Sequence, residues 1–294
     1  MLIVIVGPTG SGKTSLALDL AAFYHAPIIN GDAFQIYQDM DIGTAKVSRG
    51  SEEYKNHYLL DIVKPSETYS VKQYQEDFRK TYLELKKQYP CLIVCGGTGL
   101  YIKAALYDYS FEDEGEADTS DLDKLSNLQL YDLLKKLDPT AIETIHMNNR
   151  KRVIRAIQIA RTHKLNKTES INQQEHKLFF QDEAVKFYFI NPDRSELYLK
   201  INERVDEMFS LGLVDEVKGL LDKYNLSRTA REAIGYKEVI DYLDGKYSLE
   251  ECKELVKKRT RNYAKRQVTF FKHQLPCRVF SSKDELLKEA KNNG

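Results

Sequence analysis

The chain has 294 residues, enough for about two domains at the usual size of about 100 to 200 residues each. Hydrophobic residues make up 42% of the chain and charged residues 30%, which excludes a disordered or fibrous protein. The 44 basic and 44 acidic residues balance, so the net charge indicates no class of partner. No apolar run approaches the roughly 20 residues that span a bilayer, and we expect no membrane partner.

The amino terminus, MLIVIVGPTG, has no basic region and only five apolar residues between the initiator Met and a glycine loop. It therefore predicts a strand and not a signal peptide, and we expect a cytoplasmic protein. The four cysteines lack the CxxC spacing of zinc sites, so we interpret them as reduced and mostly structural thiols.

The first hundred residues alternate between apolar strands and helical patterns. The runs LIVIV, PIIN and CLIVC predict strands, and a helix is expected between the first two, from Thr14 to Tyr24. A second helix should follow Ser70, its N-cap, and stop before Pro90. This βαβ alternation predicts an α/β fold with a P-loop NTPase-like core around a parallel sheet.

The composition changes after Tyr107. The window 111–123 holds seven acids and no base, and helices are expected at 128–137 and 150–162, before a polar loop at 164–177. An apolar strand at 185–190 then returns the chain to the core.

The remaining chain is expected to be helical, with Ser195 and Ser248 as N-caps and the last long helix ending near Lys272. These boundaries predict three segments. They are a P-loop α/β core at 1–110, a mostly helical insertion at 111–184, and a return strand with C-terminal helices at 185–294.

A phosphate-binding loop lies between the first strand and the first helix, where the sequence matches G-x-x-x-x-G-K-[ST]. Its glycines let backbone N–H groups converge on a phosphate, and the helix N-terminus adds partial positive charge. Lys13 supplies a full charge, and Thr14 offers a hydroxyl to Mg²⁺. An ordinary glycine turn is the alternative, but it leaves the Lys-Thr pair as coincidence. The predicted phosphate-binding residues are Gly7, Pro8, Thr9, Gly10, Ser11, Gly12, Lys13 and Thr14.

A P-loop identifies a bound di- or triphosphate, but it specifies neither a nucleotide nor phosphoryl transfer. P-loop NTPases ordinarily place a metal-orienting Asp at the end of a second core strand. Here the strand CLIVC is followed by glycines and Thr98 instead. This absence argues against an ATPase.

Asp32 and Thr98 each follow a predicted strand, on the side of the sheet that carries the P-loop. Asp32 is therefore a candidate general base, and a helix N-cap is its structural alternative. The Thr98 hydroxyl is expected within reach of a phosphate held by the P-loop. A turn-stabilising role is the alternative for Thr98.

Six motifs follow one another from residue 1 to about residue 280. They are GPTGSGKT at 7–14, INGDAFQIYQDMDIGTAK at 29–46, HYLLDI at 57–62, GGTGLYIKAAL at 96–106, NNRKRVIRAI at 148–157 and TRNYAKRQ at 260–267. Together they resemble the tRNA dimethylallyltransferase family. The chain ends without the zinc-finger extension of eukaryotic members, so the resemblance is to the bacterial type.

The resemblance implies transfer of a dimethylallyl group from its diphosphate to N6 of adenosine 37 of tRNA, with release of diphosphate. The P-loop and Mg²⁺ would stabilise the charge that develops on the diphosphate as the allylic carbon–oxygen bond breaks. By resemblance Asp32 would accept the N6 proton, Thr98 would hydrogen-bond the bridging oxygen, and Arg204 would add a cationic clamp. A solvated helix face is the alternative for Arg204.

Seven basic residues and no acid occupy the window 257–272, and four of them recur at i, i+3, i+7 and i+14. A helix would align these four as a stripe suited to a phosphodiester backbone, whereas a solvated helix usually mixes signs. The four residues are Lys258, Arg261, Lys265 and Lys272.

The resemblance implies further tRNA contacts, because adenosine 37 must leave its stack to reach the pocket beside Asp32. For Phe34 a place in the core is the alternative. The residues expected to contact tRNA are Asp32, Ala33, Phe34, Gln35, Lys151, Arg152, Val153, Ile154, Arg155, Gly235, Tyr236, Lys237, Lys258, Arg261, Lys265 and Arg266. We expect the enzyme to act as a monomer.

Three other functions remain open on the sequence. A small-molecule or nucleotide kinase shares the turn after the second strand, but it needs ATP, a metal-orienting acid and an arginine-rich lid. An RNA-binding module with a nucleotide-sensing P-loop would have no turnover. An enzyme that prenylates free adenylates would have less use for the two basic segments, at 150–155 and 257–272.

Overall fold

The protein is described by a computed structural model that covers residues 1–109, 121–162, 177–181 and 183–292. It divides into two compact units, one made of residues 1–106 and 182–294 and the other of residues 107–181. Most of the acidic window at 111–123 and of the polar loop at 164–177 lies outside the described residues. Each unit is described separately.

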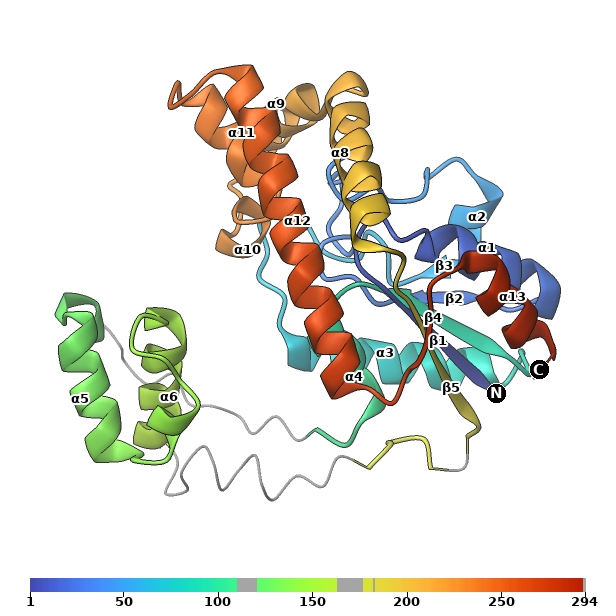
Figure 1. Ribbon diagram of the computed structural model, residues 1–294, viewed down its shortest axis with the longest axis horizontal. Helices are drawn as coiled ribbons and strands as arrows, with labels where there is room; N and C mark the ends of the chain where they lie inside the picture. Colours follow the sequence, from blue (N-terminus) through green and yellow to red (C-terminus); the bar gives the residue numbers. More distant parts are fainter. Residues whose placement is uncertain (110–120, 163–176, 182, 293–294) are drawn as a thin grey trace. The chain divides into compact units, whose positions relative to one another are not determined.

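The first unit is built on one sheet of six parallel strands in the order β3-β2-β4-β1-β5-β6 (Figure 1). The predicted α/β fold with a parallel sheet is therefore confirmed. Two short edge strands, β3 and β6, were not predicted from the sequence. The strands are β1 Leu2–Val6, β2 Ile28–Asn30, β3 His57–Tyr58, β4 Leu92–Gly96, β5 Val185–Ile190 and β6 Arg278–Phe280.

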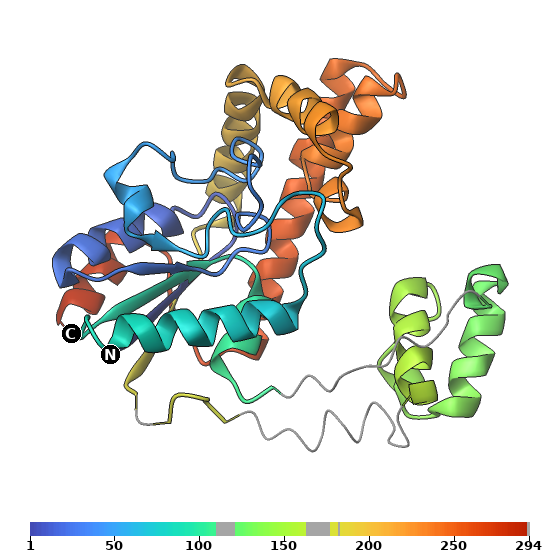
Figure 2. The same ribbon diagram turned by 180° about the vertical axis from the view of Figure 1, so that it is seen from behind.

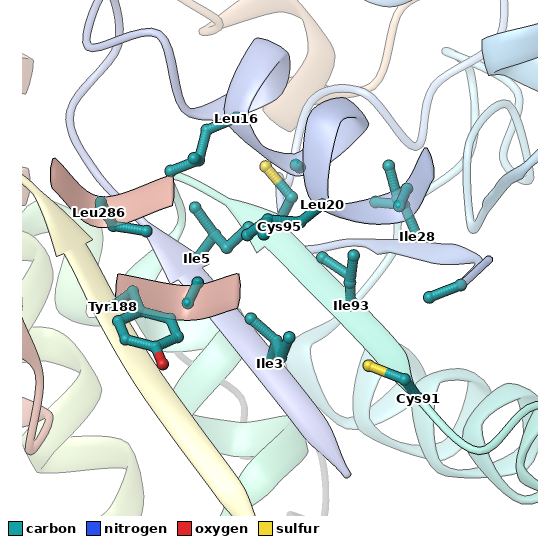
Figure 3. Packing of buried hydrophobic residues seen from close by; sticks show 14 of the residues in the cluster. Ile3, Ile5, Leu16, Leu20, Ile28, Cys91, Ile93, Cys95, Tyr188 and Leu286 are labelled. Atoms are coloured by element: carbon teal, nitrogen blue, oxygen red, sulfur yellow. The ribbon is translucent and has the colours of Figure 1, made fainter. Parts of the chain in front are cut away.

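Helices α1 (Lys13–Tyr24) and α13 (Lys283–Asn292) cover one face of the sheet. Figure 3 shows their apolar side chains meeting those of the central strands in one buried cluster. The alternation of side chains along β1 sends Ile3 and Ile5 into this cluster. Other members are Leu16, Leu20, Ile28, Cys91, Ile93, Cys95, Tyr188 and Leu286.

Helices α3 (Val71–Lys86) and α4 (Gly99–Leu106) lie on the opposite face (Figure 1). The predicted N-cap Ser70 is confirmed, since its side chain forms a capping box with Gln73. Tyr74 of α3 is fully buried and donates a 2.8 Å hydrogen bond to the Asn30 carbonyl at the end of β2. The helix therefore supports the point where the chain leaves β2.

The C-terminal half of the first unit is helical, and α8 and α12 run side by side (Figure 2). The predicted capping box of Ser248 and Glu251 is confirmed. The prediction that Ser195 caps α8 is wrong, because Asp193 is the N-cap and its carboxylate accepts from the Ser195 N–H. The helices here are α8 Arg194–Ser210, α9 Leu213–Lys223, α10 Arg228–Arg231, α11 Tyr236–Leu243 and α12 Leu249–Gln274, and a short α2 Glu52–Lys55 precedes β3.

The second unit has its own apolar cluster, built from Leu122, Leu130, Leu134, Ala141, Ile145, Val153, Ala156 and Ile157. Its elements are η1 Leu122–Lys124, α5 Asn127–Leu137, η2 Ala141–Glu143 and α6 Arg150–Thr162, so the two predicted helices are present. The ends of this unit adjoin, since Tyr107 and Leu178 form an antiparallel bridge. No helix among the described residues of either unit is long and apolar enough to cross a membrane.

Candidate active site

The P-loop joins β1 to α1, as its sequence predicted. Gly10 and Gly12 adopt φ angles of 80° and 83°, a left-handed conformation that other residues rarely take. Gly12 is the N-cap of α1, and Lys13 is its first residue. The helix N-terminus therefore faces the loop, as anion binding requires.

Two cations line one cavity beside the P-loop. Lys13 and Arg204, from α8, both border a cavity of about 100 Å³, and neither makes a salt bridge with a described residue. Burial is the main cause that lowers the pKa of each group, and for Lys13 the neighbouring Arg204 adds to it. A bound anion would offset the cost of burying the two positive charges and the repulsion between them.

One buried polar atom of these cations, Nε of Arg204, has no hydrogen-bond partner among the described residues. Buried polar groups in proteins are almost always paired, so this unpaired atom of a residue that borders the cavity indicates room for a polar ligand.

Asp32 lies at the carboxyl end of β2 and borders the same cavity as Lys13 and Arg204. Its backbone is held by the buried Asn30, whose amide accepts from the Asp32 N–H and donates to the Asp32 carbonyl, both at 3.0 Å. One carboxylate oxygen accepts from the Phe34 N–H at 2.9 Å. The helix N-cap alternative for Asp32 is therefore wrong, because no helix begins there; this oxygen closes a turn instead. The second oxygen remains available for chemistry.

Thr98 is close to Asp32 but does not border the cavity. Its hydroxyl oxygen accepts a 3.0 Å hydrogen bond from the N–H of Ala33, the residue after Asp32. Its own N–H donates to the Gly31 carbonyl at 3.1 Å. The structure therefore places Thr98 as a support for the Asp32 turn, and its predicted contact with a diphosphate oxygen stays a prediction.

Helix α12 contributes two side chains that were not selected from the sequence. Gln267 is only 5% exposed and contacts both the P-loop and the turn after β4. The Tyr263 hydroxyl lies within hydrogen-bonding reach of Thr98 and Gln267, and burial raises the pKa of Tyr263 to about 12. Both residues lie in the motif TRNYAKRQ, but only their position on the inner face of α12 sets them apart from the basic residues beside them.

Apolar side chains form part of the wall of the 100 Å³ cavity, alongside polar ones such as Thr44, Thr260 and Tyr263. The apolar part includes Phe34 beside Asp32, together with Ile201, Val205, Met208, Ile234 and Val256. A small apolar group attached to an anion would meet both charge and hydrocarbon in this cavity. Phe34 and Gln35 are only partly buried and reach the cavity, so they are not core residues.

A second and larger cavity of about 680 Å³ opens on the other side of Lys13 and Arg204. Residues 41–50 form much of its wall, and a charge network holds them. The Lys46 ammonium is fully buried and lies 2.7 Å from both Asp41 and Asp61, while Arg49 pairs with Asp39 and Asp61. This loop therefore has a fixed shape beside the phosphate site.

The predicted tRNA-contacting turn at 235–237 is engaged mainly with the protein itself. The Gly235 N–H donates to Glu238, and the Lys237 ammonium lies 2.8 Å from Glu232. The Tyr236 ring is buried. Gly235 and Tyr236 nevertheless border the 100 Å³ cavity that Asp32 also borders.

The basic residues of α12 divide into two groups. Lys257 pairs with Asp206 and Glu254, and Arg259 pairs with Glu238. Arg261 donates to Asn202, and the Arg266 guanidinium lies over the Tyr263 ring. The exposed basic residues with neither a salt bridge nor a ring contact to a described residue are Lys258, Lys265 and Lys272.

The predicted tRNA residues of the insertion lie on α6. Lys151, Arg152 and Arg155 are exposed, whereas Val153 is fully buried in the cluster of this unit. The Val153 side chain therefore stabilises this cluster, and Ile154 also packs against it, so their predicted contacts with tRNA stay predictions. Arg150 is structural too, because its guanidinium donates to the carbonyls of Leu122, Asp123 and Leu125 and to the Asn127 side chain.

The IPP transferase family model matches residues 35–274 of the chain. A tRNA dimethylallyltransferase of Anoxybacillus flavithermus is 40% identical over 99% of this chain and 94% of its own length. One of Geobacillus thermodenitrificans is 42% identical over 96% of this chain and 91% of its own length.

Solved structures agree with the sequence relatives. The crystal structure of a tRNA isopentenylpyrophosphate transferase of Staphylococcus epidermidis matches with a TM-score of 0.71 and 37% identity, over 99% of this chain and 97% of that one. A eukaryotic dimethylallyltransferase that acts on tRNA matches with a TM-score of 0.78 and 29% identity, over 92% and 69% of the two chains. The family model, the relatives matched over nearly their full length and the shared fold together show that this chain belongs to the IPP transferase family.

Proposed function

We propose that this enzyme transfers a dimethylallyl group from dimethylallyl diphosphate to N6 of adenosine 37 of tRNA. The observation that carries the proposal is the meeting of Lys13, Arg204 and Asp32 at one cavity whose wall is partly apolar. The two cations suit the diphosphate, the apolar wall suits the five-carbon group, and the carboxylate suits the amine. Its membership of the family supports the same chemistry.

The P-loop and Arg204 hold the diphosphate. Backbone N–H groups of residues 10–14 and the two side-chain cations stabilise the negative charge that develops as the allylic carbon–oxygen bond breaks. The diphosphate leaves with the electron pair of that bond. No nucleotide is needed for this step, which is consistent with the missing acid after β4.

Thr14, which borders both cavities beside the P-loop, would hold Mg²⁺ through its hydroxyl together with the bound diphosphate. The described residues contain no group of three or more His, Cys, Asp or Glu that could hold a metal ion alone. Mg²⁺ commonly keeps several waters and binds through few protein ligands together with substrate phosphates. Bound there, it would neutralise charge on the leaving diphosphate.

Asp32 accepts the proton from N6 while the nitrogen forms its bond to the allylic carbon. Its turn is fixed by Asn30 and Thr98, so the free carboxylate oxygen has a set direction. A stacked adenosine cannot reach this oxygen, and the base must therefore turn out of the anticodon loop. Phe34 and Gln35, which border the cavity, are placed to contact it.

The exposed lysines of α12 bind the tRNA backbone, as do the exposed basic residues of α6 in the insertion. Lys258, Lys265 and Lys272 have no salt bridge to a described residue, so phosphates can pair with them without displacing an internal carboxylate. One chain supplies every side chain of the proposed chemistry, which supports a monomer as the active form.

Incubation with labelled dimethylallyl diphosphate, Mg²⁺ and unmodified tRNA tests the proposal. We expect label in tRNA at adenosine 37 and release of one diphosphate per group transferred. A matched tRNA with guanosine at position 37 should accept no label. Phosphorylation of a substrate by ATP, or prenylation of free adenylate with none in tRNA, would contradict the proposal and favour one of the alternatives.

A further inference from the structure

Gln267 of α12 bridges two loops of the active site that are far apart in sequence. Its side-chain oxygen accepts a 3.0 Å hydrogen bond from the Thr9 N–H in the P-loop. Its side-chain nitrogen donates a 2.8 Å hydrogen bond to the Gly97 carbonyl in the turn after β4. A buried carboxamide with both ends engaged holds its two partners at one separation.

The Thr9 amide is therefore directed at Gln267, although it belongs to the loop that binds the diphosphate. The second partner of Gln267, the turn at Gly97, also packs closely against its side chain. A Cβ on Gly97 would lie 2.4 Å from the Gln267 nitrogen, and 3.6 Å from both an Asp32 carboxylate oxygen and Cε of Lys13. The bridge thus lies against the proposed proton acceptor and the P-loop cation.

We propose that Gln267 is a positioning residue that sets the distance between the P-loop and the turn that supports Asp32. This inference rests on the proposed function. Gln267 borders the cavity, but the protein itself engages both ends of its carboxamide. It acts through Thr9 on the diphosphate side, and through the Gly97–Thr98 turn on the Asp32 side, where the Thr98 hydroxyl accepts from the Ala33 N–H.

The carboxamide can be replaced by a group whose hydrogen bonding depends on pH. In Gln267→Glu, a neutral carboxyl accepts from Thr9 and donates to Gly97 as the amide does, whereas a carboxylate cannot donate. In Gln267→Met, a side chain of similar length makes neither strong bond at any pH. The titratable or charged groups that face this position are Lys13, Asp32, Arg204, Tyr263 and Arg266.

The test compares kcat of each variant with that of the wild type from pH 5.5 to 8.5. We expect Gln267→Glu to lower kcat about 10- to 100-fold at pH 8.5, where the carboxylate cannot donate to Gly97, and the loss to shrink only as the pH approaches the pKa of the introduced carboxyl. Gln267→Met should show a loss that does not depend on pH. Affinity for tRNA should stay within about threefold, and Gln88→Glu, the same change at an exposed position, should match the wild type.

Equal kcat for Gln267→Glu and the wild type at pH 8.5, or equal kcat for Gln267→Met and the wild type, would overturn the inference. If Gln267→Glu does not fold, Gly97→Ala tests the same bridge, because the added methyl must displace the amide. A normal kcat for folded Gly97→Ala would also overturn it.

A binding measurement separates this inference from the proposed function. Calorimetry with Mg²⁺ and inorganic pyrophosphate needs no turnover, and Gln267→Met, which adds no charge beside the anion, should bind about 10-fold more weakly than the wild type. If the wild type transfers no prenyl group, the proposed function fails, while weaker pyrophosphate binding still supports the bridge. Unchanged pyrophosphate binding in an active enzyme would contradict the bridge alone.

Discussion

The Tyr236 hydroxyl donates a 2.6 Å hydrogen bond to the Glu216 carboxylate. The same carboxylate accepts from three consecutive backbone N–H groups, those of Asp41, Ile42 and Gly43, at 3.0, 2.7 and 3.2 Å. One side chain of α9 therefore ties the loop after Asp32 to the turn at 235–237. Both segments carry residues that we assign to the substrate site.

Replacing Glu216 by Gln should loosen the 41–43 loop, because a neutral amide oxygen replaces charge-assisted bonds with weaker ones. We expect a loss of about 1 to 3 kcal/mol in the free energy of unfolding, measured in urea. Glu250→Gln, at an exposed position on α12, is the control and should change stability little. Equal stability of the two variants would show that the loop does not depend on Glu216.

Asp32→Asn should lower turnover by about 10²- to 10⁴-fold, because an amide cannot accept the N6 proton. The substitution keeps an oxygen for the Phe34 N–H, so the turn and the affinity for tRNA should be preserved. Single-turnover transfer and a filter-binding titration measure the two quantities. A rate within tenfold of the wild type would remove Asp32 from the proton transfer.

Two lysines on α12 should differ in their effect on tRNA binding. Lys265 is exposed and has no salt bridge to a described residue, whereas the Lys257 ammonium lies 2.8 Å from Asp206 and 3.1 Å from Glu254. Lys265→Ala should reduce the slope of log K against log salt by about 1, and Lys257→Ala should reduce it less. Titrations at several KCl concentrations give the slopes, and identical slopes for both variants would contradict the assignment.

Stability should depend on pH through Asp39. Hydrogen bonds from Lys223 and Tyr224 are the main causes that lower the pKa of Asp39 to about 2, and one from Arg49 adds to them. Because the folded pKa is depressed, the stabilisation is complete above the unfolded pKa of about 3.9 and is lost as pH falls through about 2.

The variant Asp39→Asn measures this contribution. It should be less stable than the wild type by roughly 1 kcal/mol at pH 7, after allowance for solvent screening, and the difference should shrink at pH 2.5. Thermal unfolding at both values measures the change, with Asp215→Asn at an exposed position as the control. A difference that grows as the pH falls would contradict the assigned sign.

The sequence predicted the local features of the fold well. The P-loop glycines, the Ser70 and Ser248 caps and the strand at 185–190 all follow from residues within a few positions of one another. The sequence did not predict β3 and β6, because strands of two and three residues are too short to show an alternation of apolar and polar side chains. It also failed at Ser195, where Asp193, two residues earlier, provides the better acceptor.

The candidate site was predictable only in part, because several of its contacts link distant segments. Glu216 meets its loop across 175 residues, and Gln267 meets Thr9 across 258, with no pattern in either neighbourhood to signal it. The charge pattern of 257–272 was likewise ambiguous. Neutralisation of Lys257 and Arg259 depends on carboxylates that include Asp206 of α8 and Glu238 of α11.

The bridge between Tyr107 and Leu178 has a consequence for how such a chain can evolve. The chain enters and leaves the second unit at neighbouring residues. This unit packs around an apolar cluster of its own residues. Two cuts in the coding sequence could therefore remove or exchange this module while β1, β4 and β5 keep their partners. Loss or exchange of the module would leave the backbone pairing of the sheet intact.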